Sequence, residues 1–315
     1  MSPNTSYTPR TPAPDPSGTA GSGGVTLEEV LALLELRPLE PSGAHLTRWR
    51  GGTQHPPADR LFGGLLLAQA IVAAGHTAAG DQRVLSVQAD FVRGVPTEQD
   101  LVWEVERVSD AVSMSTRRST LRDGRGRELF TATTRWATTR GDLPSYSALA
   151  PRRVAGPEEL PDLWERFAGD ERIPAWWSEP RPVHFRPAST PPFLAEHVEQ
   201  DPEPGQTVWI RATSPLPDDH LVRAALVAYV SDMSIIEDAF RVLGSARHEP
   251  GGRILSLTHS LTFHRRPDLS SWHQFDARVG SVSHGKALGT GEIFDERGSH
   301  LVSASQIALV RTPDV

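Results

Sequence analysis

Arg253-Ile254-Leu255-Ser256-Leu257 nearly repeats Arg83-Val84-Leu85-Ser86-Val87, which lies 170 residues upstream. Each copy follows a strongly apolar helical stretch and precedes a strand-like region that is divided by turns. From the start of each repeated strand to a turn aspartate, the distance is 39 residues in one case (Val84 to Asp123) and 41 in the other (Ile254 to Asp295). A unit that recurs with the same order and spacing indicates internal duplication. The sequence therefore predicts two versions of one small fold in tandem.

Each half is predicted to contain a buried helix followed by four strands. In the first half, an almost uninterrupted apolar stretch predicts the helix, and period-two patterns predict the strands at 84–93, 100–108, 113–122 and 128–139. In the second half, the helix is predicted from 221 to about 242, with strands at 254–264, 275–283, 287–294 and 301–310. We predict an α+β fold, a double hot-dog in which each long helix is wrapped by an antiparallel β-sheet. The edge strands of the two halves can pair into one continuous sheet.

The chain divides into four predicted regions. Residues 1–24 are rich in Pro, Gly, Ser and Thr, and we expect a disordered tail because they offer almost nothing to bury. Residues 25–140 form the predicted N-terminal hot-dog, and 141–205 form a Pro-rich connector. Residues 206–315 form the predicted C-terminal hot-dog, which is expected to carry the catalytic residues.

The composition of the 315 residues excludes several classes of function. A net charge of −7, without a clustered Lys/Arg stripe, argues against nucleic-acid binding. The lack of cysteine excludes disulfides, thiolate nucleophiles and cysteine–metal sites. No apolar run reaches the roughly 20 residues needed to span a bilayer, and the first residues lack the pattern of a signal peptide. We therefore expect a cytoplasmic protein without a membrane span.

Several well-known catalytic patterns are missing from the sequence. It contains no G-x-S-x-G nucleophile elbow, no H-E-x-x-H metal motif, and no G-x-G-x-x-G or Walker sequence after a strand. The 12 histidines are dispersed, and we expect structural roles for them, including His259 and His264 on one strand. The sequence therefore predicts neither a bound metal nor a cofactor.

Asp232 is the polar residue that most needs an explanation. It interrupts a long apolar helical run, where a carboxylate is costly unless it is paired or faces a wet cavity. One interpretation makes it a general base. The alternative places it on the solvent edge of the helix, or in a local bond to Ser231 or Ser234.

Ser256 and Gln306 interrupt two strands that are expected to pack against this helix. If Ser256 and Gln306 lay on the solvent face of the sheet, neither side chain would have a function. Together with Asp232, however, a hydroxyl and an amide could hold a water molecule and direct it at an electrophile. This chemistry is hydrolysis without a covalent intermediate.

Motifs spread over residues 26–311 resemble those of the type II acyl-CoA thioesterases, the TesB-like double hot-dog enzymes. The first half carries Arg60-Leu61-Phe62-Gly63-Gly64, Ala68-Gln69-Ala70 and Phe91-Val92-Arg93. The second half carries five further motifs: Val208-Trp209-Ile210-Arg211-Ala212, Pro217-Asp218-Asp219, Tyr229-Val230-Ser231-Asp232, Thr258-His259-Ser260 and Phe263-His264-Arg265, with Gln306 ahead of Arg311. The sequence departs from the family at Gln88, often a His, and at Gly94-Val95, often Pro-Gly. Both departures lie near the expected mouth of the acyl pocket.

The resemblance implies hydrolysis of acyl-CoA to a free acid and CoA. It gives Asp232, Ser256 and Gln306 the task of positioning the hydrolytic water. Glycine lets a backbone approach a ligand closely, so Gly63 and Gly64 are candidate contributors of oxyanion donors. Arg93 and Arg265, or the neighbouring Arg266, are candidates to meet the CoA phosphates. Hot-dog proteins of this kind commonly associate, and a homo-oligomer is expected.

Two other classes of function remain open. A hot-dog hydratase or dehydratase would need a well-placed His–Asp pair, and the sequence shows no clear one. A non-catalytic acyl-CoA-binding relative would have lost one of the three polar residues, and all three are present.

Overall fold

The computed structural model describes residues 25–43, 45–53, 60–97, 100–167, 169, 181–189, 205–245 and 252–312. The expected disordered tail, residues 1–24, lies outside the described residues. The N-terminal part of the described chain contains α1 (Leu27–Leu34), β1 (Arg37–Gly43), β2 (Leu46–Gly51), α2 (Gly63–Gly75), β3 (Gln82–Phe91), β4 (Leu101–Asp110), β5 (Met114–Arg122) and β6 (Glu128–Thr138). The remainder contains the 3-10 helix η1 (Pro157–Glu159), α3 (Leu163–Arg166), β7 (Val183–Pro187), β8 (Gly205–Ala212), α5 (His220–Ser231), α6 (Asp238–Val242), β9 (Arg253–Phe263), β10 (His273–Ser283), β11 (Lys286–Asp295) and β12 (His300–Arg311).

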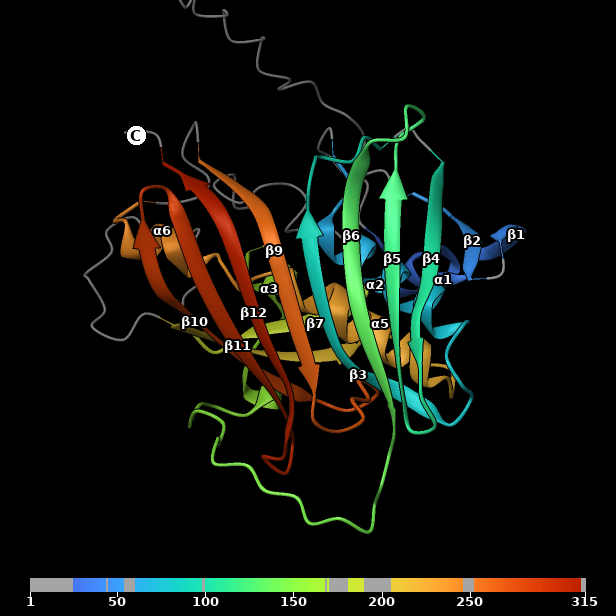
Figure 1. The fold of residues 1–315 in the computed structure, drawn as a ribbon. Helices are drawn as coiled ribbons and strands as arrows, with labels where there is room; N and C mark the ends of the chain where they lie inside the picture. The colour runs from blue at the N-terminus through green and yellow to red at the C-terminus, as the bar shows by residue number, and fades with distance from the viewer. Residues whose placement is uncertain are drawn as a thin grey trace, which may run out of the picture.

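All twelve of these strands belong to one sheet, in the order β1-β2-β4-β5-β6-β3-β9-β12-β11-β10-β8-β7 (Figure 1). The two halves meet where β3 pairs antiparallel with β9, from Ser86 opposite Thr262 to Asp90 opposite Thr258. This pairing joins one edge strand of each half, so neither edge is left open at the centre of the sheet. The double hot-dog fold predicted from the sequence is confirmed.

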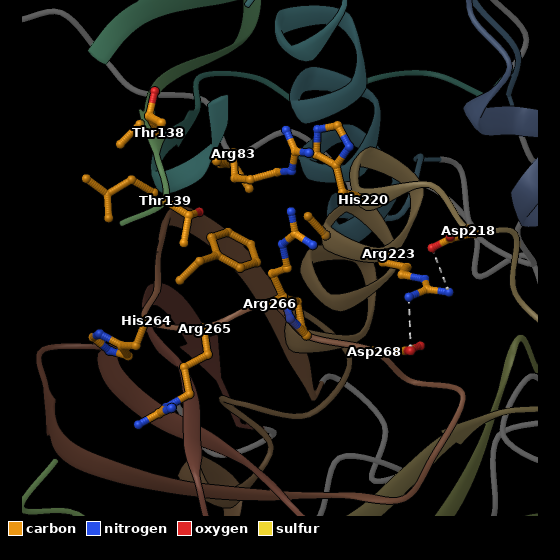
Figure 2. A pocket seen from close by; sticks show the side chains of 16 residues that line it. Arg83, Thr138, Thr139, Asp218, His220, Arg223, His264, Arg265, Arg266 and Asp268 are labelled. Carbon is orange, nitrogen blue, oxygen red and sulfur yellow. Dashed lines mark ion pairs between the residues drawn. The ribbon is translucent and has the colours of Figure 1, made fainter. Parts of the chain in front are cut away.

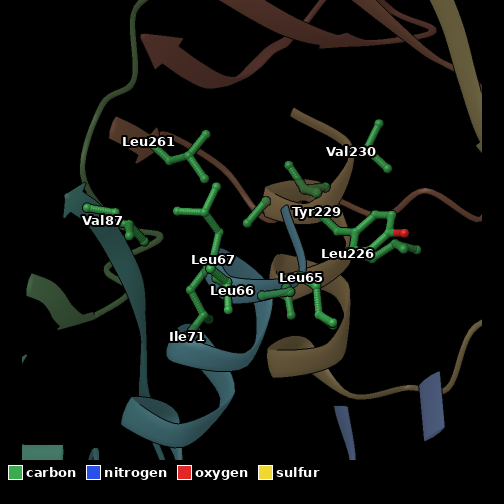
Figure 3. Packing of buried hydrophobic residues seen from close by; sticks show 14 of the residues in the cluster. Leu65, Leu66, Leu67, Ile71, Val87, Leu226, Tyr229, Val230 and Leu261 are labelled. Carbon is green, nitrogen blue, oxygen red and sulfur yellow. The ribbon is translucent and has the colours of Figure 1, made fainter. Parts of the chain in front are cut away.

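Helices α2 and α5 pack side by side (Figure 3). They run antiparallel, since Gly64 at the start of α2 lies beside Tyr229 near the end of α5, and Gly75 at the end of α2 lies beside Leu221 near the start of α5. Every residue of α2 from Gly64 to Ala74 is buried, as expected for a helix that is apolar on nearly every side. Val87 of β3 and Leu261 of β9, which are register partners, are both buried beneath the helices. The core therefore runs across the junction of the two halves.

Gly64 allows the two helices to approach closely. A Cβ atom placed on Gly64 would lie 2.4 Å from the carbonyl oxygen of Tyr229 in α5. Backbone atoms cannot yield as a flexible side chain can, so any larger residue here would push α2 away from α5. The N-terminus of α2 is thus held against the C-terminal turn of α5.

Gln69 is the one polar side chain inside the apolar run of α2, and it is fully buried. Its Nε2 donates hydrogen bonds to the carbonyl oxygens of Leu33 and Gly52, each at 2.9 Å. Its Oε1 accepts a 2.9 Å hydrogen bond from Nε1 of Trp103. The amide therefore ties α2 to α1, to the end of β2 and to β4.

The structure differs from the sequence-based expectation in two places. The predicted connector contains β7, which pairs with β8 and forms an edge of the sheet. The predicted helix over 221–242 is broken, because α5 ends at Ser231 and α6 begins at Asp238. In addition, no helix among the described residues is long and apolar enough to cross a membrane.

Replacing Gln69 with Leu should destabilise the fold. The change removes partners from two buried carbonyls and one buried indole N–H, and we expect a loss of about 3 kcal/mol of unfolding free energy. Urea denaturation followed by fluorescence would measure it. Gln88→Leu is the matched control, because Gln88 lies on the exposed face of β3. Equal losses in the two variants would contradict the structural role of Gln69.

Candidate active site

Asp232 lies at the C-terminal end of α5, where it caps the helix rather than interrupting it. The hydroxyl of Ser231 donates a 2.9 Å hydrogen bond to the carbonyl of Ala228, a local bond that competes with continued helix formation. The N–H of Met233 turns back to the carbonyl of Val230. The expected position of Asp232 deep in a helix was wrong, yet its side chain is only 4% exposed.

Ser256 faces the helices because β9 contains a β-bulge. Thr258 is the register partner of Ile307 in β12, but Ser256 is the partner of Ala308, so Leu257 is an extra residue. A bulge reverses the alternation of side chains between the two faces of a strand. On the C-terminal side of Leu257, the odd-numbered side chains of β9 point toward the helices. On its N-terminal side the alternation is reversed, so Ser256 points toward the helices.

Gln306 lies on β12 as the register partner of His259, and it is 2% exposed. Its Nε2 donates 2.6 Å hydrogen bonds to Oδ1 of Asp232 and to Oγ of Ser256. Oγ of Ser256 lies 3.5 Å from the same carboxylate oxygen. The three residues singled out in the sequence are therefore in mutual contact, although they come from three different elements.

Two polar atoms of this cluster remain available for a small ligand. Oε1 of Gln306 is buried and has no hydrogen-bond partner among the described residues. The second carboxylate oxygen of Asp232, Oδ2, faces the N-terminus of α2, where it lies 2.6 Å from a Cβ atom placed on Gly63. A carbonyl-type oxygen and a carboxylate oxygen are acceptors, and together they suit a molecule that donates two hydrogen bonds, such as water.

His259 adds a contact that the sequence reasoning missed. Its ring is fully buried, with Nε2 at 3.0 Å from Oγ of Ser231 and Nδ1 at 3.6 Å from Oδ1 of Asp232. The second distance is too long for a hydrogen bond. The alternation of His259 with the apolar Leu261 and Phe263 could have indicated that it faces the core.

The predicted substrate-binding glycines have different surroundings. Gly63 is in contact range of both Asp232 and the ring of Phe91, so it borders the polar cluster. Gly64 instead faces Tyr229 and Phe62, and its close contact serves helix packing. The cluster thus combines three residues of the second half with Gly63 and Phe91 of the first.

Arg93 and Arg265 are not brought to the polar cluster by any described contact. Arg93 is exposed and donates to the carbonyl of Glu128. Arg265 lines a cavity of about 290 Å³ near the first residues of α5, and its Nη2 lies 3.1 Å from Oγ of Ser145. A second cavity, of about 620 Å³, lies between α1, α2 and the start of α5. Neither cavity is lined by Asp232, Ser256 or Gln306.

Comparisons with known proteins agree with this architecture. The model of the acyl-CoA thioesterase C-terminal domain matches residues 153–310, and that of the N-terminal domain matches residues 52–137. Acyl-coenzyme A thioesterase 8 of Homo sapiens is 25% identical in an alignment of 309 positions that covers 94% of this chain and 92% of the relative.

Solved structures give the same picture. The tesB protein of Mycobacterium avium subs paratuberculosis is 27% identical, with a TM-score of 0.74 and coverage of 91% of this chain and 100% of that one. A protein with a hot dog fold from Alicyclobacillus acidocaldarius is similar in fold, with 19% identity, a TM-score of 0.71 and coverage of 90% and 98%.

The paired helices on one continuous sheet thus define a double hot-dog protein. The chain belongs to the acyl-CoA thioesterase family, which confirms the resemblance seen in its motifs.

Asp232→Asn should abolish most hydrolytic activity while leaving the fold intact. An amide keeps the size of the side chain but cannot accept a proton, so we expect kcat/KM for an acyl-CoA to fall by about 1000-fold. The measurement is CoA release with a thiol reagent. Asp90→Asn, on the exposed face of β3, should retain full activity. Full activity in Asp232→Asn would contradict a catalytic role for the carboxylate.

Gly63→Ala should damage the same site from the opposite side. The added methyl would meet Oδ2 of Asp232 at 2.6 Å and the ring of Phe91 at 2.8 Å, so one of them must move. Because small displacements of a catalytic group are costly, we expect kcat to fall by about 100-fold. Gly141→Ala is the control, since a Cβ there meets nothing within 4 Å. Similar kcat values for both variants would show that Gly63 is not close to the reacting atoms.

Proposed function

We propose that the protein hydrolyses acyl-CoA thioesters to a free carboxylic acid and CoA, using water that is positioned by Asp232, Ser256 and Gln306. The observation that carries the proposal is the mutual contact of these three side chains at the junction of the two halves, at 2.6 Å for both bonds of Gln306. Membership of the acyl-CoA thioesterase family supports the same reaction.

In the proposed mechanism, Asp232 acts as the general base. Oδ1 accepts from Gln306, which fixes the carboxylate plane and leaves Oδ2 to accept a proton from water. The water oxygen attacks the thioester carbonyl carbon, and the carbonyl oxygen takes up the negative charge. Collapse of this intermediate breaks the carbon–sulfur bond, and the departing thiolate of CoA can take the proton from Asp232.

The negative charge of the intermediate needs donors that are already in place. The N–H groups of Gly63 and Gly64 are candidates, since the first N–H groups of a helix have no intrahelical partner, whereas that of Leu65 already donates to the carbonyl of Phe62. The positive end of the α2 dipole acts in the same direction. Gly63 would let the substrate approach this turn, because it has no side chain to cover it.

Hydration or dehydration of an acyl-CoA is the competing function, because His259 lies beside Asp232. No clear His–Asp pair is visible in the sequence, whereas in the structure Nδ1 of His259 and Oδ1 of Asp232 are 3.6 Å apart. However, His259 is fully buried and its Nε2 is engaged with Ser231. These contacts favour a role behind Asp232 rather than direct contact with substrate.

One assay distinguishes the candidate functions. Purified protein is incubated with saturated acyl-CoA of several chain lengths and, separately, with trans-2-enoyl-CoA, and both free CoA and the enoyl absorbance are followed. A thioesterase releases CoA from the saturated substrates. Loss of the enoyl absorbance without CoA release would establish a hydratase. Binding of acyl-CoA without turnover of either kind would establish a non-catalytic relative.

We also propose that the protein acts as a homo-oligomer in cytoplasmic fatty acid metabolism. Support for association comes from the outer face of the sheet, where Leu288 and Ile307 are register partners with exposed fractions of 38% and 40%. Leu255, on the next strand, is 40% exposed. Contiguous exposed apolar residues often mark protein–protein contacts. Light scattering after size-exclusion chromatography would give the mass, and a monomer would contradict the proposal.

A further inference from the structure

The 290 Å³ cavity lies at the end of α5 that is remote from Asp232. Its wall comes from the start of β3, the end of β6, the first turns of α5, and the residues at and after the end of β9. Figure 2 shows the side chains of Arg83, His220 and Arg266 converging on one side of it. No residue of the polar cluster lines it, so it needs its own explanation.

The charges around this cavity are separated into two groups. Arg223 is neutralised, because it pairs with Asp218 at 3.4 Å and with Asp268 at 3.0 Å. Arg83 and Arg266 have no ion pair with a carboxylate among the described residues. The side of the cavity that holds Arg83 and Arg266 therefore carries net positive charge, which the carboxylate of Asp219, 3.9 Å from Nδ1 of His220, offsets only in part.

His220 responds to this charge. Burial is the largest cause that lowers its pKa, and the charge of Arg83 is the next; Arg266 contributes in the same direction, against the opposing effect of Asp219. Arg83 and Arg266 are thus close enough for their charges to lower the pKa of the His220 imidazole. A concave surface that places several cations together focuses its field on an incoming anion.

Arg83 is also held in place for such a role. Its Nη1 donates 2.8 Å hydrogen bonds to the carbonyls of Gly80 and Gln82. These bonds to neutral groups fix the guanidinium but leave its charge unpaired. A planar guanidinium presents several donors in a fixed fork, which suits the oxygens of a phosphate.

We propose that this cavity binds the phosphate groups of a nucleotide, with Arg83 and Arg266 as the principal contacts. The cavity volume, near the lower limit of about 300 Å³ typical of small-molecule pockets, is larger than a bare phosphate needs. The apolar wall, which includes Phe263 and Pro267, suits the remainder of a nucleotide.

The nucleotide can come from two sources. One is the adenosine 3′,5′-bisphosphate part of the CoA substrate, an assignment that rests on the proposed function. The 12 residues of α5 separate the cavity from Asp232 by about 18 Å along the helix, a distance that only the long pantetheine arm could bridge. The other source is a free nucleotide that binds as an effector.

The first arm of the test measures direct binding. Titration calorimetry with adenosine 3′,5′-bisphosphate compares the wild type with Arg83→Gln, Arg266→Gln, Arg266→Lys and Arg107→Gln. Arg107 is an exposed arginine on β4, and Arg107→Gln makes the same charge change away from the cavity. We expect the affinity to fall at least about tenfold in both cavity Gln variants, as loss of a charge-assisted hydrogen bond predicts. Arg266→Lys should keep most of the affinity, which separates loss of charge from misfolding.

The second arm separates the two sources. For the wild type and for the two cavity Gln variants, KM is measured with an acyl-CoA and with the matching acyl-pantetheine, which lacks the nucleotide. A rise in KM for acyl-CoA alone assigns the cavity to the substrate, whereas an unchanged KM with weakened bisphosphate binding assigns it to a free nucleotide. Both results support the proposal.

The proposal would be overturned if the wild type did not bind the bisphosphate, or if the cavity variants bound it as well as Arg107→Gln does. An equal rise in KM for both substrates would also overturn it, because acyl-pantetheine has no phosphate to lose. If the wild type hydrolysed no acyl-CoA, the proposed function would be contradicted. Calorimetry would still show whether the cavity binds the bisphosphate.

Discussion

The close approach of α2 to α5 is the constraint on which the rest of the molecule depends. The helices can touch because Gly64 offers no side chain where the carbonyl of Tyr229 passes, and the β3–β9 pairing holds the sheet continuous beneath them. The same approach brings Gly63 to the carboxylate of Asp232. The packing of the two halves and the surroundings of Asp232 therefore share one interface, and a change that separates the halves would also remove Gly63 and Phe91 from the polar cluster.

Much of the fold follows from local patterns in the sequence. A run of apolar residues on all sides of α2 requires burial on all sides, and turn residues at Asp123 and Asp295 divide strands of alternating pattern. The nature of the polar cluster was equally accessible, since Asp232, Ser256 and Gln306 each interrupt apolar stretches. These features are visible because each depends on neighbours in the sequence.

What could not be predicted is of two kinds: a helix break that depends on local side-chain bonds, and contacts between residues that are distant in the sequence. The break between α5 and α6 lies in a stretch whose apolar pattern continues, and it arises from local bonds such as that of Ser231 to Ala228. His259 lies near Asp232 because β9 passes beneath the end of α5, which no spacing in the sequence reveals. Similarly, Arg83 and Arg266 are far apart in the chain and meet through the pairing of the two halves.

The bulges in β3 and β9 make the serines of two nearly identical sequence motifs point to opposite faces of the sheet. In β3 the extra residue is Leu85, one place before the serine, and Ser86 pairs with the exposed Thr262 on the outer face. In β9 the extra residue is Leu257, one place after the serine, and Ser256 pairs with the buried Ala308. A shift of two positions in one irregularity thus decides which copy of the motif places its serine beside Asp232 and Gln306. After the duplication, the two copies could diverge through a shift in which side chains face the core, without a change of the serine itself. A single insertion or deletion in the strand could move a hydroxyl between water and the core.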